Sequence, residues 1–148
     1  MYAPRTRRPR CKSWSGKPPA GLLGSPDLVR YGEPAIPTGV AAGGALLDLS
    51  ERPTAIVCFN DKIAVGVFQA AAERGLRVPA DLAVTGFDDS EMSQATAPML
   101  TTVRQPLPEM GRIAVTMLTR LIEGQALDAL HIELATELVV RGSSEKAA

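Results

Sequence analysis

The chain has 148 residues, the length of one ordinary domain, and 45 % of them are apolar, which is enough for a packed core. Aromatic residues make up only 4 %, so that core must be aliphatic, which suits helices covering a mostly parallel sheet better than a β-sandwich. The net charge is zero, but the first 20 residues hold six cations and no acid, so the remainder is mildly acidic. An acidic body argues against extended contacts with nucleic-acid phosphates.

Cysteine usage and hydropathy bear on the compartment. Cys11 and Cys58 form neither a disulfide framework nor a metal-binding spacing, so we expect reduced thiols and a cytoplasmic protein. No apolar stretch reaches the roughly 18 residues that span a bilayer, and no apolar region follows the basic N-terminus as it does in a secretory signal. We therefore expect no membrane association.

Two regions differ in pattern. Residues 1–26 contain five prolines and no apolar periodicity, and we interpret them as a disordered or unrelated basic tail. The alternative, a tail that binds nucleic acid, is less favoured because the basic run has no helix pattern that fits a DNA groove. Residues 27–148 alternate apolar runs with amphipathic segments and form the expected folded domain.

Strands and helices are expected to alternate along this domain. The apolar runs predict strands at residues 27–32, 54–58, 82–86, 100–104 and about 132–140. Helices are predicted at about residues 38–49 with Thr38 as N-cap, from Asn60-Asp61 to Gly75, and from Pro106 and Pro108 to Gly124. The run at 54–58 is typical of a strand buried on both faces, and residues 87–98 are expected to be a polar loop. Such alternation implies an α/β fold with a mostly parallel sheet and helices on both faces.

Polar side chains follow two of the predicted strands. Asn60 and Asp61 come after one, and Asp88 and Asp89 come after the next. Because ligands of such sheets bind at the carboxyl ends of the strands, both clusters should face the same edge. Carboxylates and amides there suit the hydroxyls of a sugar. The alternatives are structural: helix capping, which we favour for Asp61, and a tight turn for the Asp-Asp pair.

Catalysis finds little support in the sequence. His131 is the single histidine and is more consistent with a surface residue than with a catalytic base. Nucleophile elbows, phosphate-binding loops and dinucleotide-binding glycine motifs are absent, and the paired acids lack a third ligand for a cation. We therefore expect no enzyme, no catalytic residue, no cofactor and no metal.

Four ordered segments resemble the LacI/GalR family of transcription regulators. They are RPTAIVCFND (52–61), ERGLRVPADLAVTGFDDSE (73–91), APMLTTVRQPLPEMGRIAVTMLTRLIEG (97–124) and TELVVRGSS (136–144). The resemblance covers residues 27–148 and implies a periplasmic-binding-protein-like fold. In that family two subdomains clamp a small effector, usually a sugar or nucleoside-like molecule. This chain is similar to most of the C-terminal subdomain, so we expect a fragment without the DNA-reading headpiece and without direct DNA binding.

The resemblance also implies roles for individual residues. Asp88 matches the acid that contacts effector hydroxyls, Asn60 matches an amide of the same pocket, and Gln105 matches a residue at the pocket edge. Phe59 and Phe87 are expected to wall the site, with core packing as the alternative for at least one of them. A dimer surface, formed with a second copy or with an intact regulator, is implied at Val65, Phe68, Thr96 and Ala97.

Two other functions compete with a regulator. The first is a fragment of a sugar-binding protein from a transport system, because the folds are related. The second is an enzyme on a doubly wound sheet, which would need a glycine-rich phosphate turn after the first strand. The absence of that turn, and the long helix that follows Arg-Gln-Pro, favour the regulator.

Overall fold

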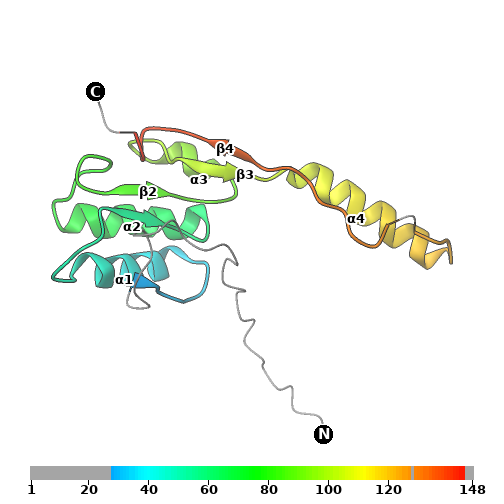
Figure 1. Ribbon diagram of the computed structural model, residues 1–148, viewed down its shortest axis with the longest axis horizontal. Helices are drawn as coiled ribbons and strands as arrows, with labels where there is room; N and C mark the ends of the chain where they lie inside the picture. The colour runs from blue at the N-terminus through cyan, green and yellow to red at the C-terminus, as the bar shows by residue number, and fades with distance from the viewer. Residues whose placement is uncertain (1–27, 128, 146–148) are drawn as a thin grey trace, which may run out of the picture.

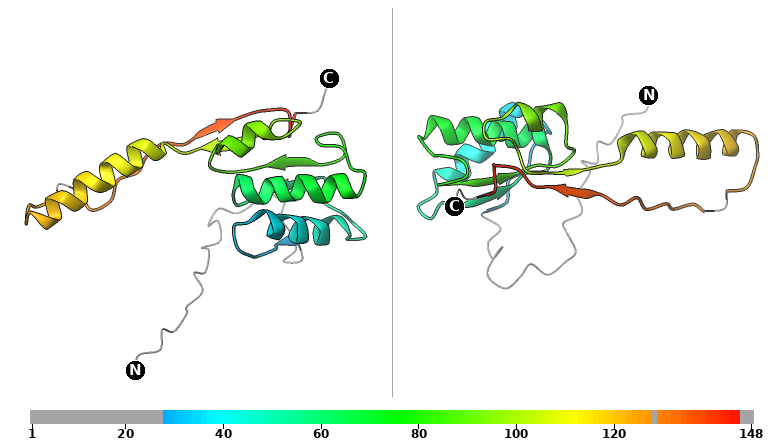
Figure 2. Two further views of the ribbon diagram at one scale, coloured as in Figure 1. Left: turned by 180° about the vertical axis from the view of Figure 1, so that it is seen from behind. Right: turned by 90° about the horizontal axis from the view of Figure 1, so that it is seen from above.

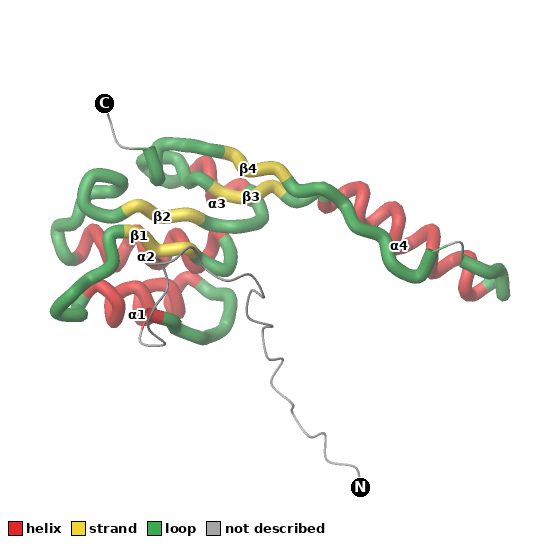
Figure 3. Tube along the Cα trace, viewed as in Figure 1, coloured by secondary structure: helices red, strands yellow, loops and turns green. Residues whose placement is uncertain are grey.

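A computed structural model describes residues 28–127 and 129–145 (Figure 1). Figure 3 separates the helices and strands from the loops that join them. The helices are α1 (Ile36–Leu47), α2 (Asp61–Glu73), α3 (Glu91–Ala95) and α4 (Leu107–Ile122). The strands are β1 (Ala55–Val57), β2 (Ala83–Thr85), β3 (Thr102–Arg104) and β4 (Glu137–Val139).

Helices α1 and α2 pack together through glycine. A Cβ added to Gly66 would lie only 2.7 Å from the Cα of Gly39, and Gly43 faces Val67. The absence of side chains lets the two backbones approach closely, so the glycines that weaken α1 as an isolated helix serve its packing. The helix begins with Ala35 as N-cap, not Thr38, because Pro37 is tolerated in the first turn.

Strands β1 and β2 pair in parallel, with Ile56 opposite Val84, and a parallel bridge from Thr85 to Thr101 continues the sheet. Leu82, Val84 and Leu100 are fully buried and form the core together with small residues of α2. The prediction that the run at 54–58 is buried on both faces is wrong for the described residues. Ile56 is buried, but Ala55 and Val57 are exposed.

The C-terminal segment returns antiparallel to its neighbour. Strand β4 pairs with β3, Thr102 lying opposite Val139, so the sheet is mixed rather than uniformly parallel. Beyond β4, the buried hydroxyl of Ser143 donates to Val84 O and accepts from Thr101 N, which ties the C-terminal residues to the core. The polar loop expected at 87–98 contains the short helix α3.

Helix α4 extends away from the rest of the described residues (Figures 1 and 2). Its amphipathic pattern predicted its bounds well, and Gly124 ends it with a φ of +70°. However, none of its residues is buried. The apolar stripe of this helix is therefore open here, with Leu118 and Ile122 at 59 % and 77 % exposure.

The strand predicted at 27–32 is wrong over its described part. Leu28 lies in a 3-10 turn and residues 29–33 form no regular structure. A strand needs a hydrogen-bonded neighbour, and no described strand pairs with this segment. The tail predicted at residues 1–26 lies outside the described residues.

Candidate functional site

The loops that follow β1 and β2 meet at one edge of the sheet, as the sequence predicted. The amide of Asp61 donates to the carbonyl of Phe87 over 2.9 Å. The amide of Asp88 donates to Val103 O over 2.9 Å, which ties the same edge to β3. Asp88 and Asp89 have φ values of +107° and +52°, left-handed conformations that Asp tolerates better than most residues. Three consecutive strand ends therefore converge on this pair.

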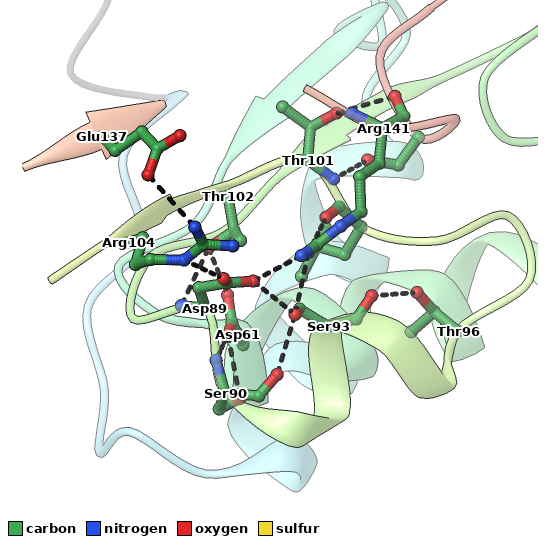
Figure 4. Close-up of polar contacts among 12 residues, drawn as sticks. Asp61, Asp89, Ser90, Ser93, Thr96, Thr101, Thr102, Arg104, Glu137 and Arg141 are labelled. Carbon is green, nitrogen blue, oxygen red and sulfur yellow. Dashed lines mark hydrogen bonds and ion pairs between the residues drawn. The ribbon is translucent and has the colours of Figure 1, made fainter. Parts of the chain in front are cut away.

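Asp61 is a buried structural centre and not the helix cap that we favoured. Its side chain accepts hydrogen bonds from Ser90 N at 2.7 Å, Ser90 Oγ at 2.9 Å and Thr102 Oγ1 at 2.6 Å (Figure 4). Only 1 % of the residue is exposed. Protein donors engage both carboxylate oxygens of this buried side chain, so Asp61 holds the loop in shape.

Asp89 is also fully engaged by protein groups. Arg104 Nε and Arg141 Nη2 each donate to its carboxylate over 2.7 Å, and Ser93 Oγ donates over 3.0 Å (Figure 4). Burial by itself would raise the pKa of Asp89, but the hydrogen bonds from Arg141, Arg104 and Ser93 outweigh it and hold that pKa below its ordinary value. This ionised carboxylate joins the loop after β2 to β3 and to the C-terminal segment.

Asp88 differs from Asp61 and Asp89 because its side chain has a single protein partner. Gln105 Nε2 donates to Asp88 Oδ1 over 2.7 Å, and no described residue engages Oδ2. Asn60 caps α2 by accepting from Ile63 N at 3.0 Å, which identifies its oxygen and leaves its amide nitrogen without a described partner. Two acceptors, Asp88 Oδ2 and Gln105 Oε1, and one donor, Asn60 Nδ2, therefore remain at this edge.

The remaining predicted residues lie around this edge in different settings. Phe87 is half-buried, whereas Phe59 is 69 % exposed. Phe68 packs partly against the core, and Val65 on the same helix is half-buried. The other two predicted dimer residues are Thr96, which caps α3, and the exposed Ala97.

Sequence reasoning missed the two arginines that build the edge. Arg104 and Arg141 bind Asp89 from 15 and 52 residues away in the chain. The available signal was composition: a buried acid needs a cation, and the Thr-Val-Arg and Val-Val-Arg runs both place one at a strand end. His131 is exposed and pairs with Glu133, which agrees with a surface position. Within the described ranges, no three metal-ligating side chains gather to hold an ion.

Comparison with known proteins places the chain in a family. Residues 7–144 match the family model of the periplasmic binding protein-like domain. The match begins inside the segment that the sequence analysis separates as a tail. The chain belongs to this family, and within it to the effector-binding domains of LacI/GalR-type regulators, as the following relatives indicate.

Two curated relatives and one solved structure illustrate the similarity. The chain is 36 % identical to the transcriptional repressor CytR of Escherichia coli over 84 % of its length, and 42 % identical to the regulator MalR of Streptomyces coelicolor over 82 %. It is 34 % identical to the regulator CelR in complex with cellobiose over 84 % of its length, with a TM-score of 0.79. The chain spans 36 %, 35 % and 38 % of these proteins, respectively. Among the described helices, none is long and apolar enough to cross a membrane.

Proposed function

We propose that this chain is the effector-binding part of a cytoplasmic LacI/GalR-type transcription regulator, and that Asp88, Asn60 and Gln105 contact a sugar-like effector. The main support is that the three aspartates at this edge differ in how many protein donors their carboxylates accept from. Protein donors occupy both oxygens of Asp61 and Asp89, whereas Asp88 Oδ2 has no partner among the described residues. A carboxylate kept available beside two amides suits neighbouring hydroxyl groups.

The chemistry of the edge favours binding over catalysis. The residues with open hydrogen-bonding capacity are a carboxylate and two amides, whereas the hydroxyls of Ser90 and Ser93 donate to Asp61 and Asp89, which hold the loops in shape. Rigidity supports the same interpretation, because Asp61 and Asp89 fix the loops on both sides of Asp88. Regulators among the relatives, rather than transport proteins, favour this function over the solute-binding alternative. We expect no turnover.

Asp88→Asn tests the assignment. Asn tolerates the left-handed backbone and keeps the turn, but it removes the charge from the hydrogen bonds to the effector. Isothermal titration with cellobiose, glucose, ribose and adenosine should find binding of at least one, and Asp88→Asn should weaken it about tenfold or more. Glu51→Gln, an exposed acid before β1, is the matched control and should bind like the wild type. Equal affinity in both variants would refute the role of Asp88.

Pairing with a second subunit is the other part of the proposal. The predicted dimer residues Val65 and Phe68 lie on α2, and Thr96 and Ala97 directly follow α3, which contacts α2. Ala97→Glu should convert a dimer to a monomer in analytical ultracentrifugation, because an unpaired charge at an interface is costly to desolvate. Ala72→Glu, on the exposed end of α2, should leave the dimer intact. A wild-type chain that is monomeric at high concentration would contradict this surface.

A further inference from the structure

Arg104 differs in its surroundings from Arg141, the other arginine that binds Asp89. The side chain of Arg141 is 12 % exposed and also donates to Ser93 Oγ, so it stabilises the buried side of the loop. The side chain of Arg104 is 49 % exposed, and its described hydrogen bonds go to the carboxylates of Asp89 and Glu137 (Figure 4). Exposed ion pairs contribute little to stability. The contacts of Arg104 therefore point to a role other than stabilising the fold.

Arg104, the last residue of β3, and Gln105, which follows it, hold two consecutive aspartates. Arg104 Nε donates to Asp89 Oδ2, and Gln105 Nε2 donates to Asp88 Oδ1, each over 2.7 Å. Two neighbouring residues at the end of β3 thus bind two neighbouring residues of the loop after β2. Together with the peptide bond inside each pair, these two hydrogen bonds close a ring. The ring fixes how the side chains of Asp88 and Gln105 lie relative to each other.

The backbone of the loop at Asp88 and Asp89 needs support from its surroundings. The φ values of these residues are +107° and +52°, and two left-handed residues in succession are unfavourable where neither is glycine. The amide of Asp88 donates to Val103 O, which is one link between the loop and β3. For the side chain of Asp89, Arg104 is the one hydrogen-bonding partner on β3 among the described residues. Loss of Arg104 would let the loop shift relative to the end of β3.

We propose that Arg104 is a positioning residue of the effector site, which acts through Asp89 to align the open acceptors of Asp88 and Gln105. This role rests on the proposed function, because Asp88 Oδ2 and Gln105 Oε1 are the acceptors assigned there to the effector. Two acceptors held at a fixed spacing bind neighbouring hydroxyl groups without first having to be ordered, which raises affinity. In this role Arg104 itself does not contact the effector.

Calorimetry on the full chain with cellobiose, glucose, ribose and adenosine tests the role by affinity. Arg104→Gln removes the ion pair with Asp89 and should weaken binding about fivefold, roughly the contribution of one hydrogen bond. Arg104→Lys keeps the charge and a donor to Asp89, so it should bind within about twofold of the wild type. Arg77→Gln is the matched control and should bind like the wild type, because Arg77 is 76 % exposed, pairs with Asp81 and precedes β2.

NMR spectroscopy of the ligand-free chain tests whether Arg104 acts by aligning Asp88 and Gln105. The side-chain amide of Gln105 gives its own signals, which depend on its hydrogen bond to Asp88. Arg104→Gln should move these signals toward those of an unbonded amide, whereas Arg77→Gln should leave them unchanged. Weaker binding by Arg104→Gln with unchanged signals of Gln105 would mean that Arg104 contacts the effector directly, and would overturn the positioning role.

Asp88→Asn separates the positioning role from the proposed function itself. If Asp88→Asn weakens binding and Arg104→Gln does not, the effector site is retained and the role of Arg104 is wrong. If the wild type binds none of the four ligands, or Asp88→Asn binds as tightly as the wild type, the proposed function fails and the role of Arg104 fails with it. Thermal unfolding followed by circular dichroism should show that Arg104→Gln folds like the wild type. A variant that does not fold would make Arg104 a structural residue and would also overturn its positioning role.

Discussion

Asp89→Asn should lower the free energy of unfolding by about 3 kcal/mol at neutral pH. The side chain of Asp89 is 5 % exposed and neutralises Arg141, whose own side chain is 12 % exposed, together with the half-exposed Arg104. Because Asn also fits the left-handed backbone at this position, the loss of stability reflects the removed charge. Urea unfolding followed by circular dichroism measures the difference.

The effect of Asp89→Asn should depend on pH in a defined direction. The pKa of Asp89 is held below its ordinary value of about 3.9, so its carboxylate stabilises the fold above that pH. The contribution falls as the pH drops through the lowered pKa, and the difference between wild type and variant should shrink in acid. Glu51→Gln, an exposed acid, should show little difference at any pH. A difference in free energy of unfolding between wild type and Asp89→Asn that stays constant down to acidic pH would refute the ionic role of Asp89.

Gly66→Ala should destabilise the protein by about 3 kcal/mol, although alanine is the better helix former by about 1 kcal/mol. A Cβ on Gly66 would lie 2.3 Å from Ile36 O and 2.7 Å from Gly39 Cα, and these backbone atoms belong to α1. The helices must separate to accept it. Thermal and urea unfolding measure the change.

Gly111→Ala is the matched control for that substitution. Gly111 also lies inside a helix, α4, but a Cβ there meets nothing within 4 Å. Helix propensity then acts alone, and the variant should be as stable as the wild type or more stable by up to about 1 kcal/mol. If Gly66→Ala behaved like Gly111→Ala, the close packing of α1 on α2 would be wrong.

Local pattern predicted the helices better than it predicted their surroundings. Period and end signals located α4 correctly, including its end before Gly124, because those signals lie within the segment itself. Burial requires another element to pack against, and the apolar period within a segment does not identify that element. For that reason the outer face of Val57 was expected to be buried and is exposed. The predicted strand at 27–32 failed for the same reason, since pairing is not a local property.

The candidate site was predicted in outline and missed in detail. Strand ends of a parallel sheet meet at one edge, and this rule was enough to bring Asn60 and Asp88 together. The rule did not distinguish Asp61 and Asp89, which are held by protein groups, from Asp88, whose carboxylate keeps an oxygen without a described partner. That separation comes from Arg141, Arg104 and Thr102, which reach the edge from distant parts of the chain. Pattern alone therefore left Asp61 as a cap and gave Asp89 no partner.

Amide chemical-shift mapping by NMR tests the central claim most directly. The uniformly 15N-labelled chain is titrated with the sugar or nucleoside that binds in calorimetry. The account predicts that the largest changes cluster at residues 59–62, 86–90 and 103–105, where the ends of β1, β2 and β3 meet. Largest changes along α4, or beside β1 at residues 28–34, with none near Asp88, would contradict an effector site at this edge.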